Sequence, residues 1–199
     1  MYDPFDHYFH KAQKEWYKAR SAFKLEEIDQ KFHLFDKKVH TVCDIWCAPG
    51  SWLQYSAARL QALKIPDAML IGFDIKDMHI SLPHVQTYKQ DITDHVAVQK
   101  LLDKHQIKQF DLLISDMAPN TMGVKDLDAM RLFGLLESTL WMYETLLKKD
   151  GKFVTKLFMG PWFEEYINNL KKIFGGKNIK IFKPESCRKE SKETYVIKI

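Results

Sequence analysis

The sequence predicts an α/β fold: a mostly parallel sheet with helices on both faces. Short apolar runs recur along the chain, each bounded by turn residues, as buried strands require. Stretches of helical character separate most of these runs, which is typical of a parallel sheet crossed by helices. The chain has 199 residues and no linker, repeat or low-complexity segment, so we expect a single domain over residues 1–199.

Residues 1–35 are expected to form an N-terminal helical region. Basic and aromatic residues are interleaved in its first part, and apolar residues form a helical face in its second part. A solvated amphipathic helix explains this pattern as well as a surface for nucleic acid does. The basic residues are Lys11, Lys14, Lys18 and Arg20, and the others are Trp16, Tyr17, Phe23, Leu25, Ile28 and Phe32.

Seven segments are predicted strands, because each is a short run rich in aliphatic, β-branched or aromatic residues. The first five alternate with helices and are expected to be parallel, and the late strands supply one or two antiparallel ones. The segments are 41–46, 68–74, 84–88, 110–115, 152–158, 178–183 and 193–199.

Four helices are predicted between these strands. A Pro-Gly turn breaks the first strand before the helix 52–63, and Gly175-Gly176 ends the helix 162–174. The other two predicted helices cover residues 96–105 and about 127–147.

Composition excludes some classes of protein. The formal net charge is +4, which is compatible with a polyanionic partner without requiring one. No apolar run is long enough to span a membrane, and no signal sequence opens the chain, so we expect a cytoplasmic protein with no membrane partner. Cys43, Cys47 and Cys187 form no CxxC pair, which favours packing over metal binding and fits a reducing compartment.

The loop Ala48-Pro49-Gly50-Ser51-Trp52 directly follows the first predicted strand. Ligands of open α/β sheets bind at such strand ends, where Gly50 lets the backbone approach closely and free N–H groups of the next helix suit a carboxylate. An ordinary strand-to-helix turn would look the same. The loop is neither a G-x-G-x-x-G dinucleotide fingerprint nor a P-loop.

Carboxylates follow the next two predicted strands. Asp74 ends the second strand, where it could accept the hydroxyls of an adenosine ribose, and Asp91 follows the third, where it could receive the adenine amino group. Each is also a candidate helix cap or loop residue, and Asp91 competes with Asp94 for the cap.

Five motifs in order resemble the FtsJ (RrmJ-type) family of RNA 2′-O-ribose methyltransferases over nearly the whole chain. The family usually has a small residue, often Gly, in place of Trp46, and a second Gly in place of Ser51. The motifs are Arg20–Phe32, Asp44–Gln54, Ser115–Asn120, Phe153–Phe158 and Lys183–Tyr195.

The resemblance implies a Rossmann-like methyltransferase fold that uses S-adenosylmethionine, with a seven-stranded sheet whose last strand is antiparallel. It implies a catalytic tetrad of Lys24, Asp116, Lys156 and Glu193, and no metal. Its implied donor-binding residues are Gly50, Trp52, Asp74, Asp91 and Asp116.

Lys156 is the candidate base or cation beside the ribose 2′-oxygen, because it interrupts an apolar strand. Asp116 and Glu193 would hold it in line. A second cation at Lys24 would lower the Lys156 pKa, and buried carboxylates would oppose that shift.

The expected substrate is RNA, most simply a uridine of large-subunit ribosomal RNA or the subunit itself, bound by a monomer. The N-terminal region is the first candidate RNA surface, and Arg188, Lys189 and Lys192 form a second basic rim. Two alternatives stay open: a methyltransferase of the tRNA anticodon loop, and a non-catalytic RNA-binding ribosome-assembly factor. A dehydrogenase is disfavoured, because the glycine fingerprint is missing.

Overall fold

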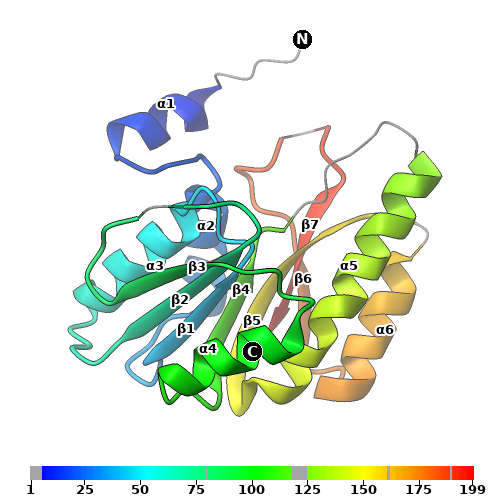
Figure 1. Cartoon of the computed structure of the whole chain (residues 1–199). Helices are drawn as coiled ribbons and strands as arrows, with labels where there is room; N and C mark the ends of the chain where they lie inside the picture. Colours follow the sequence, from blue (N-terminus) through cyan, green and yellow to red (C-terminus); the bar gives the residue numbers. More distant parts are fainter. Residues whose placement is uncertain (1–5, 79, 118–124, 161, 189) are drawn as a thin grey trace.

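The computed structural model describes residues 6–78, 80–117, 125–160, 162–188 and 190–199 (Figure 1). Several residues named above lie outside this part of the chain. They are residues 1–5 of the N-terminal region, Ala118, Pro119 and Asn120 of the Ser115 motif, and Lys189 of the basic rim.

All seven strands join one sheet, in the order β3-β2-β1-β4-β5-β7-β6. β1 to β5 are parallel, and β7 is antiparallel to both of its neighbours, β5 and β6. The predicted fold class is therefore confirmed. The strands are β1 Thr41–Ile45, β2 Met69–Asp74, β3 Val85–Lys89, β4 Phe110–Ser115, β5 Leu147–Phe158, β6 Ile179–Phe182 and β7 Glu193–Lys198.

Helices cover both faces of the sheet (Figure 1). α2 and α3 pack on one face, and α4, α5 and α6 on the other, so two apolar cores flank the strands. α1 stands apart from both layers, above α2 and α3 in the view of Figure 1. The helices are α1 His7–Lys14, α2 Ala22–Phe32, α3 Ser51–Ala62, α4 His95–Lys104, α5 Lys125–Thr145 and α6 Phe163–Phe174.

Two features differ from the sequence-based expectation. β5 begins at Leu147, which pairs with Phe110, rather than at residue 152. The segment Lys148–Gly151 is polar and ends in Gly, so it has the composition of a turn, and it forms the bulge between the paired positions Phe110–Leu147 and Leu112–Lys152. The N-terminal region consists of two helices, because the chain turns at Trp16, where φ is +62°.

Strand alternation explains the lysine inside the apolar run of β5. Phe153 and Leu157 belong to the core under α4 to α6, whereas Val154 belongs to the core under α2 and α3. Because side chains alternate along a strand, Lys156 lies on the α2–α3 face with Val154. Across the β5–β7 ladder its partner is Tyr195.

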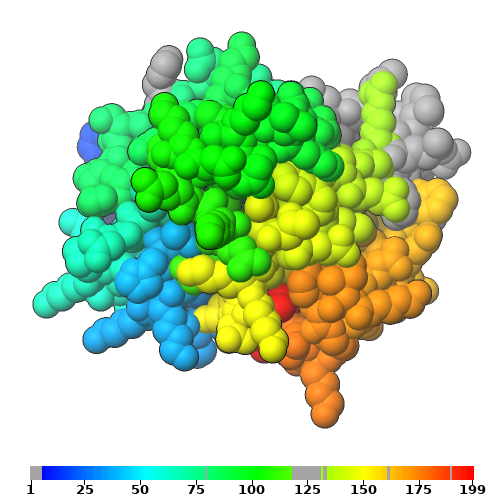
Figure 2. Space-filling view, turned by 60° about the horizontal axis from the view of Figure 1, so that its bottom comes forward, coloured from blue at the N-terminus to red at the C-terminus, as the bar shows by residue number. Residues whose placement is uncertain are grey.

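Figure 2 brings the bottom of the view in Figure 1 toward the reader. α4, the start of β5 and α6 lie close together there, and only a small part of the C-terminal strand is visible between them. In the described part of the chain, no helix is both long and apolar enough to cross a bilayer.

Gly72 of β2 tests how closely α3 packs on the sheet. A Cβ there would lie 2.7 Å from Cys47 Sγ and 2.8 Å from Leu53 Cδ1, so Gly72→Ala should destabilise the fold by about 1–3 kcal/mol. Gly134→Ala is the matched control, because a Cβ on this helical residue meets nothing within 4 Å. It should stabilise the fold by about 0.5–1 kcal/mol. Urea unfolding measures both, and equal stability of the Gly72→Ala and wild-type proteins would contradict this packing.

Candidate active site

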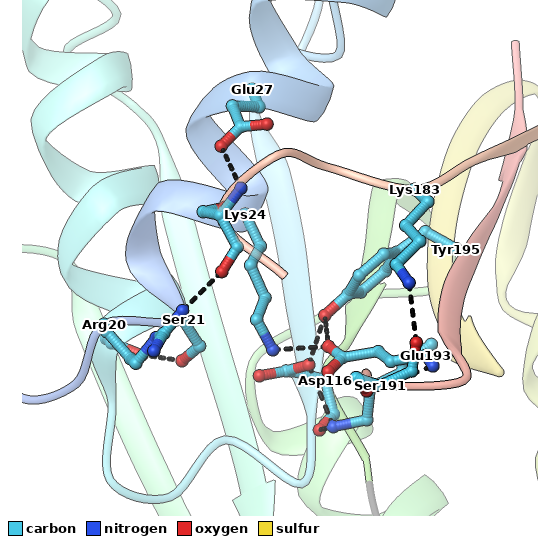
Figure 3. A network of polar contacts seen from close by, with 12 residues as sticks. Arg20, Ser21, Lys24, Glu27, Asp116, Lys183, Ser191, Glu193 and Tyr195 are labelled. Atoms are coloured by element: carbon cyan, nitrogen blue, oxygen red, sulfur yellow. Dashed lines mark hydrogen bonds and ion pairs between the residues drawn. The ribbon is translucent and has the colours of Figure 1, made fainter. Parts of the chain in front are cut away.

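Four polar residues from separate elements meet at the carboxyl ends of the central strands, and Figure 3 labels three of them, Lys24, Asp116 and Glu193. Lys24 comes from α2, Asp116 from the residue after β4, Lys156 from β5 and Glu193 from the start of β7. These are the four tetrad residues predicted from the sequence, and the structure brings all four together. Their catalytic roles stay a prediction.

Each lysine pairs with one carboxylate. Lys24 Nζ donates a hydrogen bond to Glu193 Oε1. Lys156 Nζ donates to Asp116 twice, to the backbone oxygen at 2.5 Å and to Oδ1 at 3.0 Å. An ammonium has three N–H groups, so with respect to the described residues the third N–H of Lys156 is available to a substrate oxygen.

Tyr195 joins the two pairs into one network (Figure 3). Its Oη lies 2.5 Å from Glu193 Oε1 and 2.8 Å from Asp116 Oδ1. A hydroxyl has one proton, so it donates to one of these carboxylates at a time. The sequence placed Tyr195 in a motif without a role, although its position two residues after Glu193 puts both on one face of β7. We call Lys24, Glu193, Tyr195, Asp116 and Lys156 the charge network.

The charge network is largely withdrawn from solvent, since Lys156 is 6% exposed and Glu193 is 9% exposed. Burial by itself would lower the pKa of Lys24, but the charges of Asp116 and Glu193 outweigh it, and the Lys24 pKa is raised. Burial, together with the same two carboxylates, raises the pKa of Tyr195 well above its ordinary value. Lys24 is therefore an ammonium and Tyr195 a neutral phenol at neutral pH.

α2 is fastened to the loop that leads into β7. Glu27 accepts hydrogen bonds from the backbone N–H groups of Glu185, at 2.5 Å, and Ser186, at 2.9 Å. Arg20 donates to the Ser186 backbone oxygen at 2.5 Å. These contacts set α2 and β7 relative to each other, and so position both ends of the Lys24–Glu193 pair.

Gly50 shapes the loop after β1. Its φ of +105° lies in the region that favours glycine, and a Cβ there would come within 3.0 Å of Ile80 Cδ1. Gly50 is the N-cap of α3, and no side chain caps this helix end. The first N–H groups of α3 can therefore bind an anion such as a carboxylate.

Asp74 supports this loop from the end of β2. One carboxylate oxygen accepts from Ala48 N at 2.9 Å, and the other accepts from Lys76 N at 2.8 Å. Each oxygen keeps a further lone pair for a ligand hydroxyl. Asp74 thus holds the loop whether or not it also contacts a ribose.

The competition between Asp91 and Asp94 for the helix cap has a clear outcome. Asp94 caps α4, accepting from Ala97 N at 3.0 Å. Asp91 is exposed and accepts from Thr93 N at 2.9 Å through Oδ1. The carboxylate of Asp91 is therefore not occupied by the helix end.

The tryptophans of the loop have different surroundings. The Trp52 side chain is 2% exposed, its Nε1 donates to Ser21 O at 2.8 Å, and its ring centroid lies 5.9 Å from that of Tyr195. The ring of Trp52 therefore supports Tyr195, and the backbone N–H of Trp52 is the group that can face a ligand.

Trp46 has a φ of +64° and packs against the core under α4 to α6. Ser51, in place of the usual Gly, bonds Ser21 Oγ at 2.8 Å.

Asp44 is a further buried carboxyl that the sequence analysis did not single out. It is 1% exposed, and its Oδ2 has no hydrogen-bond partner among the described residues. Burial, and then the charges of Asp116 and Asp74, raise the pKa of Asp44 well above its ordinary value. The signal in the sequence is an acidic residue inside an apolar strand. No group of His, Cys, Asp and Glu residues in the described ranges has the arrangement of a metal site.

Comparisons with known proteins identify the family of this chain. The family model of FtsJ-like methyltransferases matches residues 17–199. A ribosomal RNA large subunit methyltransferase E from Desulfatibacillum aliphaticivorans is 42% identical over 96% of this chain and 88% of its own. One of the same name from Bdellovibrio bacteriovorus is 39% identical over 98% of this chain and 96% of its own.

Solved structures show the same fold. A crystal structure of a protein assigned as a ribosomal RNA methyltransferase, from Plasmodium falciparum, has a TM-score of 0.77 and 28% identity, covering 92% of this chain and 97% of its own. Human methyltransferase-like protein 13, in complex with SAH, has a TM-score of 0.56 at 10% identity over 89% of this chain and 81% of its own, which is a likeness of fold alone.

Asp44 gives a pH-dependent prediction. Its raised folded pKa means that the folded protein holds a proton that the unfolded chain releases above about pH 4. The wild-type protein thus loses stability as pH rises from about 4 toward that raised pKa. Asp44→Asn stays neutral, so its stability relative to wild type should rise between pH 4 and 7.

Urea unfolding at pH 4.5 and pH 7 checks this, with Asp36→Asn as the control of opposite sign. Burial raises the Asp36 pKa, but hydrogen bonds from Lys152 and the backbone outweigh it, so that pKa is lowered. Asp36→Asn should therefore lose stability relative to wild type as pH rises through about 4. Parallel pH profiles for Asp44→Asn and wild type would show that Asp44 does not hold a proton in the fold.

Proposed function

This chain belongs to the FtsJ-like methyltransferase family, and we propose that it transfers a methyl group from S-adenosylmethionine to the 2′-oxygen of an RNA ribose. The observation that carries the proposal is the charge network, in which Asp116 holds the buried Lys156 ammonium at the carboxyl edge of the sheet. A protein that only binds RNA gains nothing from burying that amine in an apolar strand, so the network disfavours a non-catalytic assembly factor.

In this reaction the ribose 2′-oxygen attacks the methyl carbon in line, and the carbon–sulfur bond breaks as the new carbon–oxygen bond forms. The sulfur keeps the electron pair of the broken bond, and the 2′-hydroxyl proton passes to water. The 2′-hydroxyl is a poor nucleophile at neutral pH, so charge that develops on its oxygen must be stabilised or its proton removed. The third N–H of Lys156 is directed to this oxygen, while the two bonds to Asp116 fix the amine. Tyr195 lies within hydrogen-bonding distance of Asp116, and Lys24 and Glu193 pair with each other.

The methyl donor would lie along the loop after β1. The uncapped first turn of α3 and the backbone of Gly50 and Trp52 suit its carboxylate, and the positive φ of Gly50 is a conformation that residues with a Cβ rarely adopt. Asp74 would receive the ribose hydroxyls, and Asp91 the adenine amino group. Asp116 would contact both the sulfonium of the donor and the amine of Lys156. The methyl donor and the ribose acceptor would therefore meet beside this one carboxylate.

Large-subunit ribosomal RNA, most simply at a uridine, is the substrate that the relatives favour. Those named ribosomal RNA large subunit methyltransferase E match 96% or more of this chain at about 40% identity. A tRNA anticodon loop is the second candidate and has no observation in its favour. Cytoplasmic location and a monomeric state stay predictions.

Lys156→Ala should lower the rate of methyl transfer by roughly 10²–10⁴-fold while the donor affinity changes little. The reason is that Lys156 acts on the 2′-oxygen in the transition state rather than on the bound donor. Single-turnover transfer to large ribosomal subunits, paired with donor titration, separates the two quantities.

Lys148→Ala is the matched control, because Lys148 lies on the same strand but pairs with Asp111 near its start. It should transfer methyl groups at the wild-type rate. A folded Lys156→Ala protein that binds donor and keeps the wild-type rate would remove Lys156 from the chemistry.

Calorimetry should show binding of S-adenosylmethionine and none of NAD. Asp91→Ala should weaken donor binding by about 10-fold or more, because it removes a charged hydrogen-bond acceptor for adenine. Asp94→Ala should leave donor affinity unchanged and cost about 1 kcal/mol of stability, because it removes the cap of α4. Binding of NAD in place of the methyl donor would overturn the cofactor assignment, and an unchanged Asp91→Ala affinity would overturn the adenine contact.

A further inference from the structure

Trp16 stands where a helix end usually carries glycine. α1 closes with the two hydrogen bonds of a Schellman motif, from Tyr17 N to Ala12 O at 2.9 Å and from Trp16 N to Gln13 O at 3.3 Å. Trp16 is the residue that must adopt the left-handed conformation, and its φ is +62°. Glycine is favoured at such a position, since it has no Cβ to clash.

The indole of Trp16 is not buried against the described residues, so packing does not offset the cost of this conformation. It is 86% exposed, compared with 41% for Trp162, and a large apolar ring is therefore left in water. Both the backbone conformation and the exposure are unfavourable for folding. A role in binding accounts for a tryptophan at this position.

The backbone beneath the ring is held in place. Gln54 of α3 accepts a hydrogen bond from Lys18 N at 2.7 Å and donates one to Trp16 O at 3.0 Å. One side-chain amide thus binds the backbone at two positions of the turn. Tyr17 packs edge-on against Phe23, with ring centroids 5.8 Å apart. The turn is therefore fixed while the indole projects outward, which lowers the entropy lost when a partner binds.

The surroundings of the ring suit RNA rather than a protein. Lys14 and Lys18 are exposed on either side of Trp16, and Gln13 and Glu15 beside it are exposed as well. A single ring among polar residues is too small for the apolar centre of a protein interface, but it matches one base with phosphates on both sides.

Lys11, which the sequence analysis grouped with Lys14 and Lys18, has partners within the protein. Its Nζ lies 4.2 Å from the centroid of the Phe23 ring and within 4 Å of carboxylate oxygens of Glu15 and Glu26, at 3.8 and 3.9 Å. Its charge is therefore already partly compensated within the protein.

We propose that Trp16 is a stacking platform for an unpaired base of the RNA substrate, with Lys14 and Lys18 contacting the flanking phosphates. The proposal rests on the function proposed above, because it takes RNA as the substrate. Trp16 belongs to the same segment as Lys24, and Ser21 between them is bonded to Ser51 and Trp52 of α3. A base held by Trp16 thus anchors the RNA to the segment that carries part of the charge network.

The test compares Trp16→Gly with wild type on two labelled probes of about 20 nucleotides, longer than a typical single-strand site. One is oligouridylate, and the other is the same ribose-phosphate chain without bases. Trp16→Gly should bind oligouridylate about 5- to 150-fold more weakly, because it loses a stacking contact, and Trp16→Phe should recover part of the affinity. Both variants should bind the abasic chain as wild type does.

Two controls separate stacking from folding and from charge. His33→Gly removes another exposed ring from a left-handed position, with φ +51° at the far end of α2, and should leave both affinities unchanged. The double variant Lys14→Ala with Lys18→Ala should weaken binding of both probes and reduce the log–log salt slope by about two. Trp16→Gly should unfold at the wild-type temperature or above it, because glycine relieves the backbone.

Equal binding of oligouridylate by Trp16→Gly and wild type would overturn the platform. A loss of affinity for assembled ribosomal subunits, with oligouridylate binding unchanged, would also overturn it by assigning the ring to a ribosomal protein. Methyl transfer by wild type to large ribosomal subunits and to total RNA is measured in parallel. If wild type transfers no methyl group, the proposed function is contradicted. If wild type transfers methyl groups and Trp16→Gly binds oligouridylate as wild type does, only the platform is contradicted.

Discussion

Burying two ammonium groups and two carboxylates at one edge of a sheet is the constraint on which this structure depends. Each of these charges is costly to remove from water unless a partner lies within hydrogen-bonding distance. Lys24 pairs with Glu193, Lys156 pairs with Asp116, and the Tyr195 hydroxyl lies within hydrogen-bonding distance of both carboxylates. Removing one member of a buried pair leaves the other unpaired, which typically costs about 3–5 kcal/mol. The ends of β4, β5 and β7 and the helix α2 must therefore be in place together.

α2 has a larger part in this arrangement than its position ahead of the sheet suggests. Glu27 and Arg20 fasten it to the loop before β7. Ser21, at its start, accepts a hydrogen bond from Trp52 and shares one with Ser51, so the same segment supports the first turn of α3. The loop that would hold the methyl donor and the network that would act on the acceptor thus share one support. Displacement of α2 would disturb both.

The sequence was most informative where a residue conflicts with its local pattern. The apolar runs predicted all seven strands, and Lys156 was conspicuous as a charge within one of them. The start of β5 at Leu147 was missed, because it is set by the pairing of Leu147 with Phe110 and is followed by a polar segment of turn-like composition. Tyr195 and Ser51 were present in motifs, but their roles depend on partners far away in sequence: Asp116 after β4 for Tyr195, and Ser21 before α2 for Ser51. The conformation of Trp16 is likewise set by the way α1 ends.

The central claim is that this chemistry is performed on an RNA ribose. Mapping 2′-O-methylation across total RNA, from cells with the gene, without it, and with Lys156→Ala in its place, tests that claim most directly. The account predicts one ribose, on large-subunit ribosomal RNA, that is methylated only in cells with the wild-type gene. A methylation map that is the same in all three strains would contradict it.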